Sequence, residues 1–355
     1  MSALAPFARK IAATYVREDW LDFVFSHVDP LLAVNRVLAE VVSISQETPD
    51  IKRFVFRPNA NWQGFRAGQF MPVKVQIDGI FHERCYSLVS EPTDGLLEIG
   101  VKRQPNGKVS NWLHDNLKVG DVIELGQADG EFVLPEALPA KLLLIAGGSG
   151  VTPVYSLLVE ALKRNAALDV TVVYYANSEQ DLAFGKEMVE LAVKHPALKL
   201  QYALFTSGEG GKFSEQQLTN ACPDFAARSA FICGPQGLMK AAADLWAAKG
   251  IAGQLKQELF GPAGLASDAV GNAMPITLRR SQQAMLHTKT TLLESAEAGG
   301  ARPAYGCRMG VCKQCSCTKV SGAVRDKITG AIDSSPNTQV RICVSEPLSP
   351  VVLDI

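Results

Sequence analysis

The chain has 355 residues, 47% of them hydrophobic and 20% charged, which indicates a globular protein of two or three domains. Its formal net charge of −1 argues against a nucleic-acid-binding role, and no apolar run reaches the roughly 18 residues of a membrane-spanning helix. The first residues lack the apolar stretch of a signal peptide, which favours a cytoplasmic protein whose thiols stay reduced.

Charge is unevenly distributed along the sequence. Residues 274–355 contain ten Lys and Arg against six Asp and Glu, whereas the remainder contains 25 against 30. A basic C-terminal region has two interpretations: it docks on an acidic partner or an anionic membrane surface, or it offsets the charge of an anionic cofactor. The sequence leaves both open.

Residues 1–36 are predicted to form a helical N-terminal extension. Apolar residues recur at helical spacing from Trp20 to Val28, and Asp29-Pro30 then interrupts the pattern. The predicted helix either packs on the body of the protein or presents its apolar face to lipid or a partner.

Residues 37–138 predict an antiparallel β-barrel. Short strand-like segments are separated by turn residues: NRVLAEVVSISQ, IKRFVFRP, QFMPVKVQI, CYSLVS, LLEIGVKR and DVIELGQ. The segment SNWLHDNL is expected to form a short helix between the last two strands.

Residues 139–262 predict an α/β domain with a parallel sheet, because strand and helix patterns alternate. The strand patterns are KLLLIAG, DVTVVYYAN, LKLQYALFT and SAFICGP; the helix patterns are PVYSLLVEALKRN, DLAFGKEMVELAVKH and QGLMKAAADLWAAKG. Residues 263–273 are small and flexible and predict a linker. Residues 274–355 then predict a third, α+β domain.

Four cysteines of this third domain are separated by four, two and 27 residues: Cys307, Cys312, Cys315 and Cys343. This is the plant-type spacing for a [2Fe–2S] cluster, in which closely spaced thiolates reach inward and a distant fourth ligand fixes the loop. Gly306 and Gly310 would let backbone amides approach the sulfides. A structural zinc site is the alternative, but it usually uses two close Cys pairs, or Cys with His. Cys317 is interpreted as a bystander.

With this loop included, the chain resembles the three-domain reductases of the ferredoxin–NADP reductase superfamily. Residues 274–355 resemble a plant-type ferredoxin of β-grasp fold, and the preceding residues from 37 resemble a flavin barrel followed by a nicotinamide domain. The domain order is similar to that of the reductases of phenylacetyl-CoA epoxidase, of bacterial membrane fatty-acyl desaturases and of hybrid-cluster protein. The resemblance implies FAD, NAD(P)H and a [2Fe–2S] cluster as cofactors.

The segment RCYSLVS resembles the family's R-x-Y-S flavin motif. The resemblance implies that Tyr86 lies against the isoalloxazine ring and that Ser87 hydrogen-bonds near N5 and O4 of that ring. It also implies that Arg84 neutralises the FAD pyrophosphate. Without the resemblance, an Arg and a Tyr on a strand are usually surface and core residues.

The segment VKRQPNGKVSNWL resembles the second flavin segment of the family and begins at Val101. Gly107 would allow close approach of the backbone to the cofactor. Val109 and Ser110 start a predicted helix whose N-terminal amides can bind the diphosphate.

The segment AGGSGVTP follows a buried strand and opens a helix, so that glycines such as Gly148 let a dinucleotide approach the backbone. Its spacing is not the Rossmann G-x-G-x-x-G. In the family, the corresponding residues hold the pyrophosphate, with Thr152 near the nicotinamide. Pro153 suits the first turn of the helix.

Two further segments resemble motifs around the nicotinamide. CGP, with Cys233 and Gly234, implies a thiol that positions the nicotinamide C4 for hydride transfer, although a buried thiol before a turn is the simpler interpretation. ELF resembles the family's E-x-F segment and implies that Glu258 and Phe260 border the flavin and nicotinamide site, although Phe260 could be a core residue. With Tyr86 and Ser87, Cys233 and Glu258 complete the expected catalytic set.

The residues after the second strand of the α/β domain bear on the choice between NADPH and NADH. Asn177 and Ser178 stand there, where NADPH-preferring relatives often have Arg. No acidic residue stands at the strand end, and Ser178 with Ser207 and Lys212 could bind a 2′-phosphate. These observations favour NADPH slightly over NADH.

The function implied is electron transfer from NAD(P)H through FAD and the cluster to a partner protein. We expect a monomer whose acceptor is a membrane di-iron desaturase or hydroxylase, with peripheral association at the inner membrane face. The alternative acceptors are a soluble multicomponent oxygenase, as for phenylacetyl-CoA epoxidase, or hybrid-cluster protein. Two other classes are a zinc-stapled binding module and a flavin or ferric reductase that serves small molecules.

Overall fold

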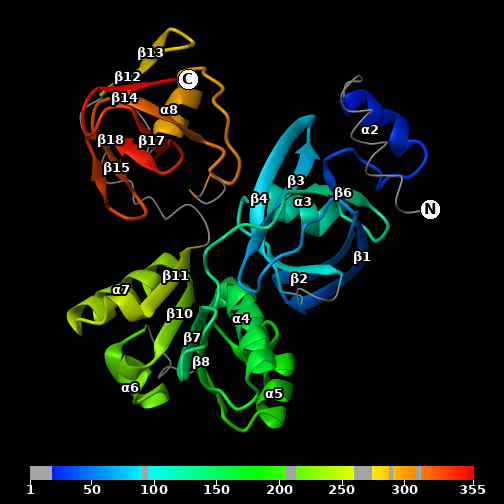
Figure 1. The fold of residues 1–355 in the computed structure, drawn as a ribbon, viewed down its shortest axis with the longest axis vertical. Helices are drawn as coiled ribbons and strands as arrows, with labels where there is room; N and C mark the ends of the chain where they lie inside the picture. The colour runs from blue at the N-terminus through cyan, green and yellow to red at the C-terminus, as the bar shows by residue number, and fades with distance from the viewer. Residues whose placement is uncertain are drawn as a thin grey trace. The chain divides into compact units, whose positions relative to one another are not determined.

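The computed structural model describes residues 18–89, 91, 95–204, 213–259, 274–287, 291–308, 310 and 313–355. Contacts between residues divide the chain into two compact units, Met1–Glu258 and Leu259–Ile355. The first contains a β-barrel and an α/β domain, and the second contains an α+β domain (Figure 1). The three-domain fold class predicted from the sequence is therefore confirmed. Within the described ranges, no helix has both the length and the apolar character needed to cross a membrane.

The barrel is a six-stranded antiparallel sheet in the order β4-β3-β6-β1-β2-β5. Its strands are β1 (Val37–Thr48), β2 (Ile51–Pro58), β3 (Phe70–Ile77), β4 (Ile80–Ser87), β5 (Leu97–Lys102) and β6 (Val122–Leu125). A bridge between Leu88 and Ile99 joins the two ends of the sheet and closes it. Asp78 and Gly79 both have positive φ in the tight turn between β3 and β4, as a two-residue Asp-Gly hairpin requires.

The interior of the barrel is apolar because alternate residues of each strand point inward. Phe54, Phe56, Met71 and Ile99 are completely buried there. The expected short helix is α3 (Lys108–Asn116), which buries Leu113 against the same core. Burial of this kind contributes about 1.5–3 kcal/mol for each large apolar side chain.

Within the described residues, the predicted N-terminal extension contains the helix α2 (Glu18–Ser26). Turns follow Ser26, as expected from the break at Asp29-Pro30, and residues 1–17 lie outside the described part of the chain. The buried Asp22 carboxylate accepts hydrogen bonds from Val34 N and Arg36 Nε, both at 2.7 Å, and so fixes α2 to the start of β1. Trp20 and Phe23 remain 57% and 63% exposed.

The α/β domain has a five-stranded sheet in the order β11-β10-β7-β8-β9, in which β10, β7, β8 and β9 are parallel. Its strands are β7 (Lys141–Gly147), β8 (Asp169–Ala176), β9 (Leu198–Leu204), β10 (Ser229–Gly234) and β11 (Leu255–Leu259). Its helices are α4 (Val151–Arg164), α5 (Gly185–Lys194), α6 (Glu215–Ala221) and α7 (Gln236–Ala248). The strand order reverses between β7 and β10, and the carboxyl ends of such neighbours are where ligands bind in open α/β sheets.

Helix α5 begins later than the sequence pattern predicts. Phe184 precedes it with a φ of 57°, which ends any helix that would start at Asp181. The Phe184 ring is buried, stacks on Tyr155 with centroids 5.1 Å apart and lies 4.6 Å from the Arg53 guanidinium of the barrel. Packing between the two domains of the first unit therefore sets the helix start, against the local pattern.

The second unit has two sheets, β13-β12-β19-β14-β17 and β16-β15-β18. Its elements are β12 (Pro275–Leu278), β13 (Gln283–Leu286), α8 (Leu292–Ala298), β14 (Ser316–Ser321), β15 (Val324–Asp326), β16 (Ile332–Asp333), β17 (Thr338–Arg341), β18 (Ser345–Pro347) and β19 (Val351–Leu353). The Thr291 hydroxyl caps α8 by accepting a hydrogen bond from Glu294 N at 3.2 Å. Leu292, Ile276 and Leu353 are fully buried in the core between helix and sheet.

Candidate functional site

The R-x-Y-S segment lies at the carboxyl end of β4. Tyr86 is partly buried and packs against the barrel core, and burial raises the pKa of its phenol, so the ring is neutral at physiological pH. Arg84 is partly exposed, and its guanidinium donates to Glu83 O at 2.7 Å, which leaves further donors for an anion. Ser87 is buried, and its hydroxyl has no hydrogen-bond partner of standard geometry among the described residues.

The second predicted flavin segment connects β5 to α3. Gly107 caps α3, and a Cβ there would lie 2.4 Å from Ser110 Oγ, which itself accepts a hydrogen bond from Gln104 N. Gly107 is therefore required by the turn itself, whatever approaches it. His114 Nε2 lies 2.8 Å from Val101 O and attaches the helix to the strand.

Val101 and Val109 have side chains that are buried in the barrel core, with 0% and 1% exposure. Any contact of these two residues with a ligand would therefore come from their backbone groups. Asn111, one turn into α3, has a buried side-chain oxygen with no hydrogen-bond partner among the described residues. Unsatisfied buried oxygens such as this one and that of Ser87 fit a polar cofactor seated against the barrel.

The first glycine-rich loop and the CGP segment meet at the carboxyl ends of β7 and β10. A Cβ on Gly150 would lie 2.2 Å from Cys233 O, and one on Gly147 would lie 2.7 Å from Pro235 Cδ. Gly148 has a φ of 52° and open space where a Cβ would stand. The glycines therefore let two loops from distant parts of the sequence approach each other directly.

Thr152 faces the barrel from the first turn of α4. It is 2% exposed, its hydroxyl donates to Ser149 O at 3.0 Å, and a Cβ on Gly100 of β5 would lie 2.8 Å from its methyl carbon. Pro153 is buried beside it in the same turn, where proline costs no helical hydrogen bond. Gly100 thus allows the α/β domain to approach strand β5 of the barrel.

Three predicted residues from distant segments, Ser87, Cys233 and Glu258, converge in a buried position within the first unit. Burial raises the pKa of the Glu258 carboxyl to about 8, although the nearby Ser87 hydroxyl lowers it somewhat. Burial also raises the pKa of the Cys233 thiol, and Glu258 raises it further once its carboxyl ionises at higher pH. At neutral pH both groups hold their protons, so Cys233 is not a thiolate nucleophile. Phe260 lies outside the described residues.

An acidic residue that the motifs did not reveal lies at the end of the second parallel strand. The Ser178 hydroxyl, predicted to face a 2′-phosphate, donates to Asp181 Oδ2 at 2.8 Å. The Tyr174 hydroxyl lies 3.3 Å from Asp181 O and 3.2 Å from Gly148 O, and its single proton can be donated to either carbonyl. In the sequence, the only signal of this contact is a carboxylate three residues after the serine. The intervening turn brings the Ser178 hydroxyl and the Asp181 carboxylate together.

Three of the four predicted cluster ligands are buried in the second unit: Cys307, Cys315 and Cys343. Cys315 Sγ and Cys343 Sγ lie 3.0 Å apart, and the charge of Cys307 affects the pKa of both thiols. Among the described residues, no three or more His, Cys, Asp or Glu side chains form a group that could hold a metal ion. Cys312, the fourth predicted ligand, lies outside those residues.

The backbone of the cysteine loop is strongly curved. Arg308, Gly310 and Lys313 all have positive φ, at 60°, 76° and 57°. The Arg341 guanidinium donates to Gly310 O at 2.5 Å and also pairs with Asp326. A Cβ on Gly310 would lie 2.8 Å from Ile328, so packing as well as conformation requires glycine there. Buried thiols on a curved loop fit a sulfur-ligated cluster.

Cys317 differs from the three predicted ligands. It lies on β14 and is buried, and burial raises the pKa of its thiol to about 12. Its place within β14, opposite Val340 of β17, separates it from the curved loop.

Comparisons with known proteins follow the same three-part division. The chain matches the oxidoreductase FAD-binding domain over residues 38–133, the oxidoreductase NAD-binding domain over residues 144–244 and the 2Fe-2S iron-sulfur cluster binding domain over residues 276–348.

It is 30% identical to an NADPH oxidoreductase of Mycobacterium tuberculosis, over 99% of this chain and 92% of that protein. It is 28% identical to the glycine betaine monooxygenase reductase subunit of Chromohalobacter salexigens, over 88% of this chain and 94% of that protein. The structure of phthalate dioxygenase reductase has the same fold, with a TM-score of 0.65 and 23% identity over 90% of this chain and 98% of that one.

The buried Glu258 carboxyl gives a pH-dependent stability that a substitution can expose. Its pKa is about 8 in the folded chain and 4.5 without burial, so the folded state binds the proton more tightly. The contribution of this carboxyl to the free energy of unfolding is therefore fully present below about pH 4.5 and is lost as pH rises from there through about 8. Glu258→Gln is expected to remove this decline, leaving the variant on the order of 2–4 kcal/mol more stable than the wild type above pH 8, relative to their difference at pH 5.

Thermal unfolding of both proteins in parallel from pH 5 to pH 9 measures this effect. Glu215→Gln is the control, since Glu215 pairs with Lys249 on the surface of the same domain. Parallel pH profiles for wild type and Glu258→Gln would contradict the burial of a protonated carboxyl.

Proposed function

We propose that this chain, which belongs to the three-domain family of ferredoxin–NADP reductase-like proteins with a [2Fe–2S] domain, has a membrane di-iron desaturase or hydroxylase as its acceptor. The chain is an FAD-, NAD(P)- and [2Fe–2S]-dependent oxidoreductase that transfers electrons. The observation that carries the site assignment is the convergence of Ser87, Cys233 and Glu258 from separate segments of the first unit.

Each group is assigned to residues of this chain that suit it. FAD would lie against Tyr86, with Ser87 available to its ring and Arg84 to its pyrophosphate. The nicotinamide nucleotide would lie over the loop from Gly148 to Pro153 and beside Cys233 and Gly234. The cluster would be held by the four cysteines of the second unit: Cys307, Cys312, Cys315 and Cys343.

When bound, FAD takes two electrons as a hydride and releases them singly, and the cluster carries one electron at a time. The residues of the chain orient and shield these groups. The neutral Cys233 thiol would pack against the nicotinamide and hold its reactive carbon toward the flavin. The protonated Glu258 carboxyl offers an O–H donor without placing a charge in a buried site, and the Ser87 hydroxyl can donate or accept beside it.

The proposed acceptor at a membrane is supported by two surface features. Trp20 and Phe23 are exposed on α2, and the second unit carries an excess of positive charge. The test is delivery of electrons to a desaturase in membranes by the wild type and by Trp20→Ser/Phe23→Ser. Delivery that is lowered at least about fivefold supports the proposal. Unchanged delivery, with normal FAD and iron content, counts against it.

A soluble oxygenase is the second candidate acceptor, favoured by the resemblance to the glycine betaine monooxygenase reductase subunit. In that case the two apolar substitutions would leave the reductase activity unchanged in a soluble reconstituted system. Binding of the wild-type chain to vesicles would also be absent. The two candidates therefore predict opposite results in the same pair of proteins.

NADPH is proposed as the donor, in keeping with the name of the Mycobacterium tuberculosis relative. Asp181 limits this preference, because its carboxylate engages Ser178 and would repel a 2′-phosphate. Asp181→Asn is expected to raise kcat/KM for NADPH relative to NADH by roughly tenfold, or about 1.4 kcal/mol. Glu179→Gln, on the exposed side of the same turn, is the charge-matched control. An equal change for both nucleotides in Asp181→Asn would show that the carboxylate does not face the 2′ position.

A further inference from the structure

The cysteine loop lies in a stretch of sequence that carries positive charge only. Between Glu297 and Asp326 there are five Lys or Arg residues and no Asp or Glu. Lys319 is completely buried, where it donates to Gly322 O and Ser335 O, so it does not contribute to the surface. The other four are Arg302, Arg308, Lys313 and Arg325.

Ion pairs within the second unit neutralise some of these cations and leave others unmatched. Five carboxylates pair with cations: Glu297 with Arg308, Asp326 with Arg341, Asp333 with Lys319, Glu346 with Arg325 and Lys327, and Asp354 with Arg279 and Arg280. Among the described residues, Arg302 and Lys313 have no carboxylate within ion-pair distance. Two of these carboxylates, Glu346 and Asp354, each pair with two cations, which leaves further positive charge on the surface.

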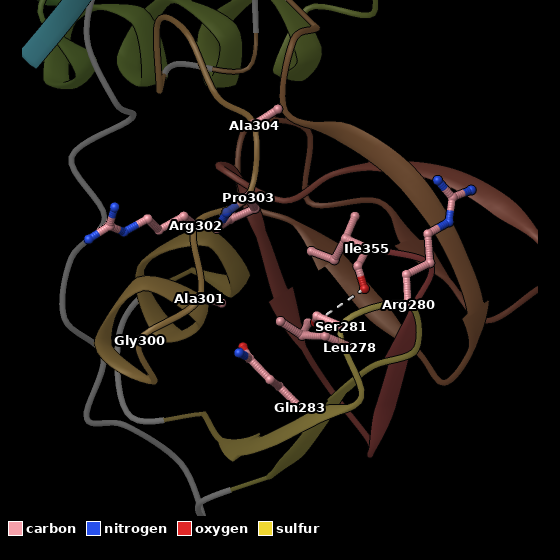
Figure 2. Close-up of a pocket in the computed structure, with 10 residues that line it drawn as sticks. All are labelled: Leu278, Arg280, Ser281, Gln283, Gly300, Ala301, Arg302, Pro303, Ala304 and Ile355. Atoms are coloured by element: carbon pink, nitrogen blue, oxygen red, sulfur yellow. Dashed lines mark hydrogen bonds between the residues drawn. The ribbon is translucent and has the colours of Figure 1, made fainter.

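One of the unmatched cations precedes the cysteine loop and the other lies within it. Arg302 lies five residues before Cys307, and Lys313 lies two residues before Cys315. Both side chains are exposed. Figure 2 shows the Arg302 side chain extending outward from the segment that also carries Ala301 and Pro303. This segment lines a pocket of about 540 Å³ together with the polar side chains of Ser281 and Gln283.

We propose that this surface, defined by Arg302 and Lys313 and called here the basic loop face, docks on an acidic surface of the acceptor protein. The inference rests on the proposed function, because an electron leaving a cluster in this loop must cross whatever surface the acceptor contacts. Exposed cations around that exit attract a partner of opposite charge and orient it on encounter. The pocket beside Arg302 offers space for a carboxylate side chain of the partner, a shape that a flat lipid surface would not fill.

A role of these cations in tuning the cluster, or in binding lipid, would give different results from docking. If the cations offset the negative charge of the cluster, their removal shifts its reduction potential instead of its reaction with acceptors. If they bind anionic lipid, their removal weakens binding to charged vesicles and leaves the reaction with soluble acceptors unchanged.

The experiment uses the FAD- and cluster-loaded full chain with two haem proteins as probes, the acidic soluble domain of cytochrome b5 and the basic cytochrome c. Arg302→Glu is expected to lower kcat/KM for cytochrome b5 at least about fivefold at about 20 mM salt, and to raise it for cytochrome c. Both differences should fall below about twofold at about 300 mM salt, where screening is strong. Arg302→Lys should restore the wild-type values, and Lys313→Gln should change them in the same direction as Arg302→Glu.

Lys118→Glu is the matched control, because Lys118 is an exposed cation of the barrel domain. Equal effects of Lys118→Glu and Arg302→Glu would show a net-charge effect and overturn the proposal. So would unchanged kinetics with both probes, a shift in cluster potential that accounts for the rate change, or lost binding to vesicles containing phosphatidylserine with unchanged cytochrome b5 kinetics. Failure of the proposed function is distinguishable, since NAD(P)H would then not bleach the cluster of the wild type at all.

Discussion

Cys343→Ser is expected to abolish electron delivery to a protein acceptor while reduction of the flavin by NAD(P)H continues. Cys343 is 4% exposed, and its Sγ lies 3.0 Å from Cys315 Sγ, so the substitution removes a buried thiol from the predicted set of cluster ligands. A serine oxygen is a harder ligand than a thiolate and suits a [2Fe–2S] cluster poorly. We expect cytochrome c reduction to fall at least about 100-fold, with reduced iron and sulfide content.

The control for this change is Cys317→Ser. Cys317 is also a buried cysteine of the second unit, but it lies within β14, opposite Val340 of β17, and not on the curved loop. The variant should keep its iron, sulfide and visible spectrum. Loss of the cluster from Cys317→Ser but not from Cys343→Ser would contradict the ligand assignment. Zinc in place of iron and sulfide would favour a binding module instead.

Gly150→Ala is expected to disable nucleotide binding while the flavin barrel stays intact. The added Cβ would lie 2.2 Å from Cys233 O and 2.4 Å from Cys233 C, and neither backbone atom can move without shifting the loop after β10. The displacement would separate the two loops that are proposed to hold the nucleotide. We expect kcat/KM for NADPH to fall at least about 100-fold, since errors of about 1 Å at such positions have effects of that size.

Gly237→Ala provides the matched control for the glycine substitution. It lies at the start of α7, and a Cβ there would meet nothing within 4 Å. Alanine should be neutral or slightly stabilising at this position. Steady-state kinetics and FAD content, measured for both variants, show whether nucleotide binding is lost while the flavin barrel stays intact. Normal kcat/KM in Gly150→Ala would mean that the contact with Cys233 is not needed for nucleotide binding.

The fold class was predictable because the periodic patterns of the sequence agree with the strand pairing and helix packing of the structure. The alternation of strands and helices after Lys141 predicted the parallel sheet, and the short strand-like segments separated by turn residues predicted the antiparallel one. The start of α5 was not predictable in this way. It depends on the stacking of Phe184 on Tyr155 and its contact with Arg53, which come from segments far apart in the chain.

For the candidate site as well, the sequence predicted individual residues but not the contacts that depend on the fold. Short motifs identified Ser87, Cys233 and Glu258 as separate residues, and the fold brings them together. The sequence could not show that Asp181 would occupy the Ser178 hydroxyl, since a three-residue turn decides it. It also could not show that Val101 turns its side chain into the barrel core.

An anaerobic titration of the purified protein with NADPH, and separately with NADH, followed by visible absorption, tests the central claim most directly. The flavin and cluster bands are both expected to bleach, with the cluster accepting electrons that enter through the flavin. The nucleotide with the tighter and faster reaction identifies the donor. Bleaching of the flavin bands with no change in the cluster bands would contradict the account, because the two centres would then not exchange electrons in this protein.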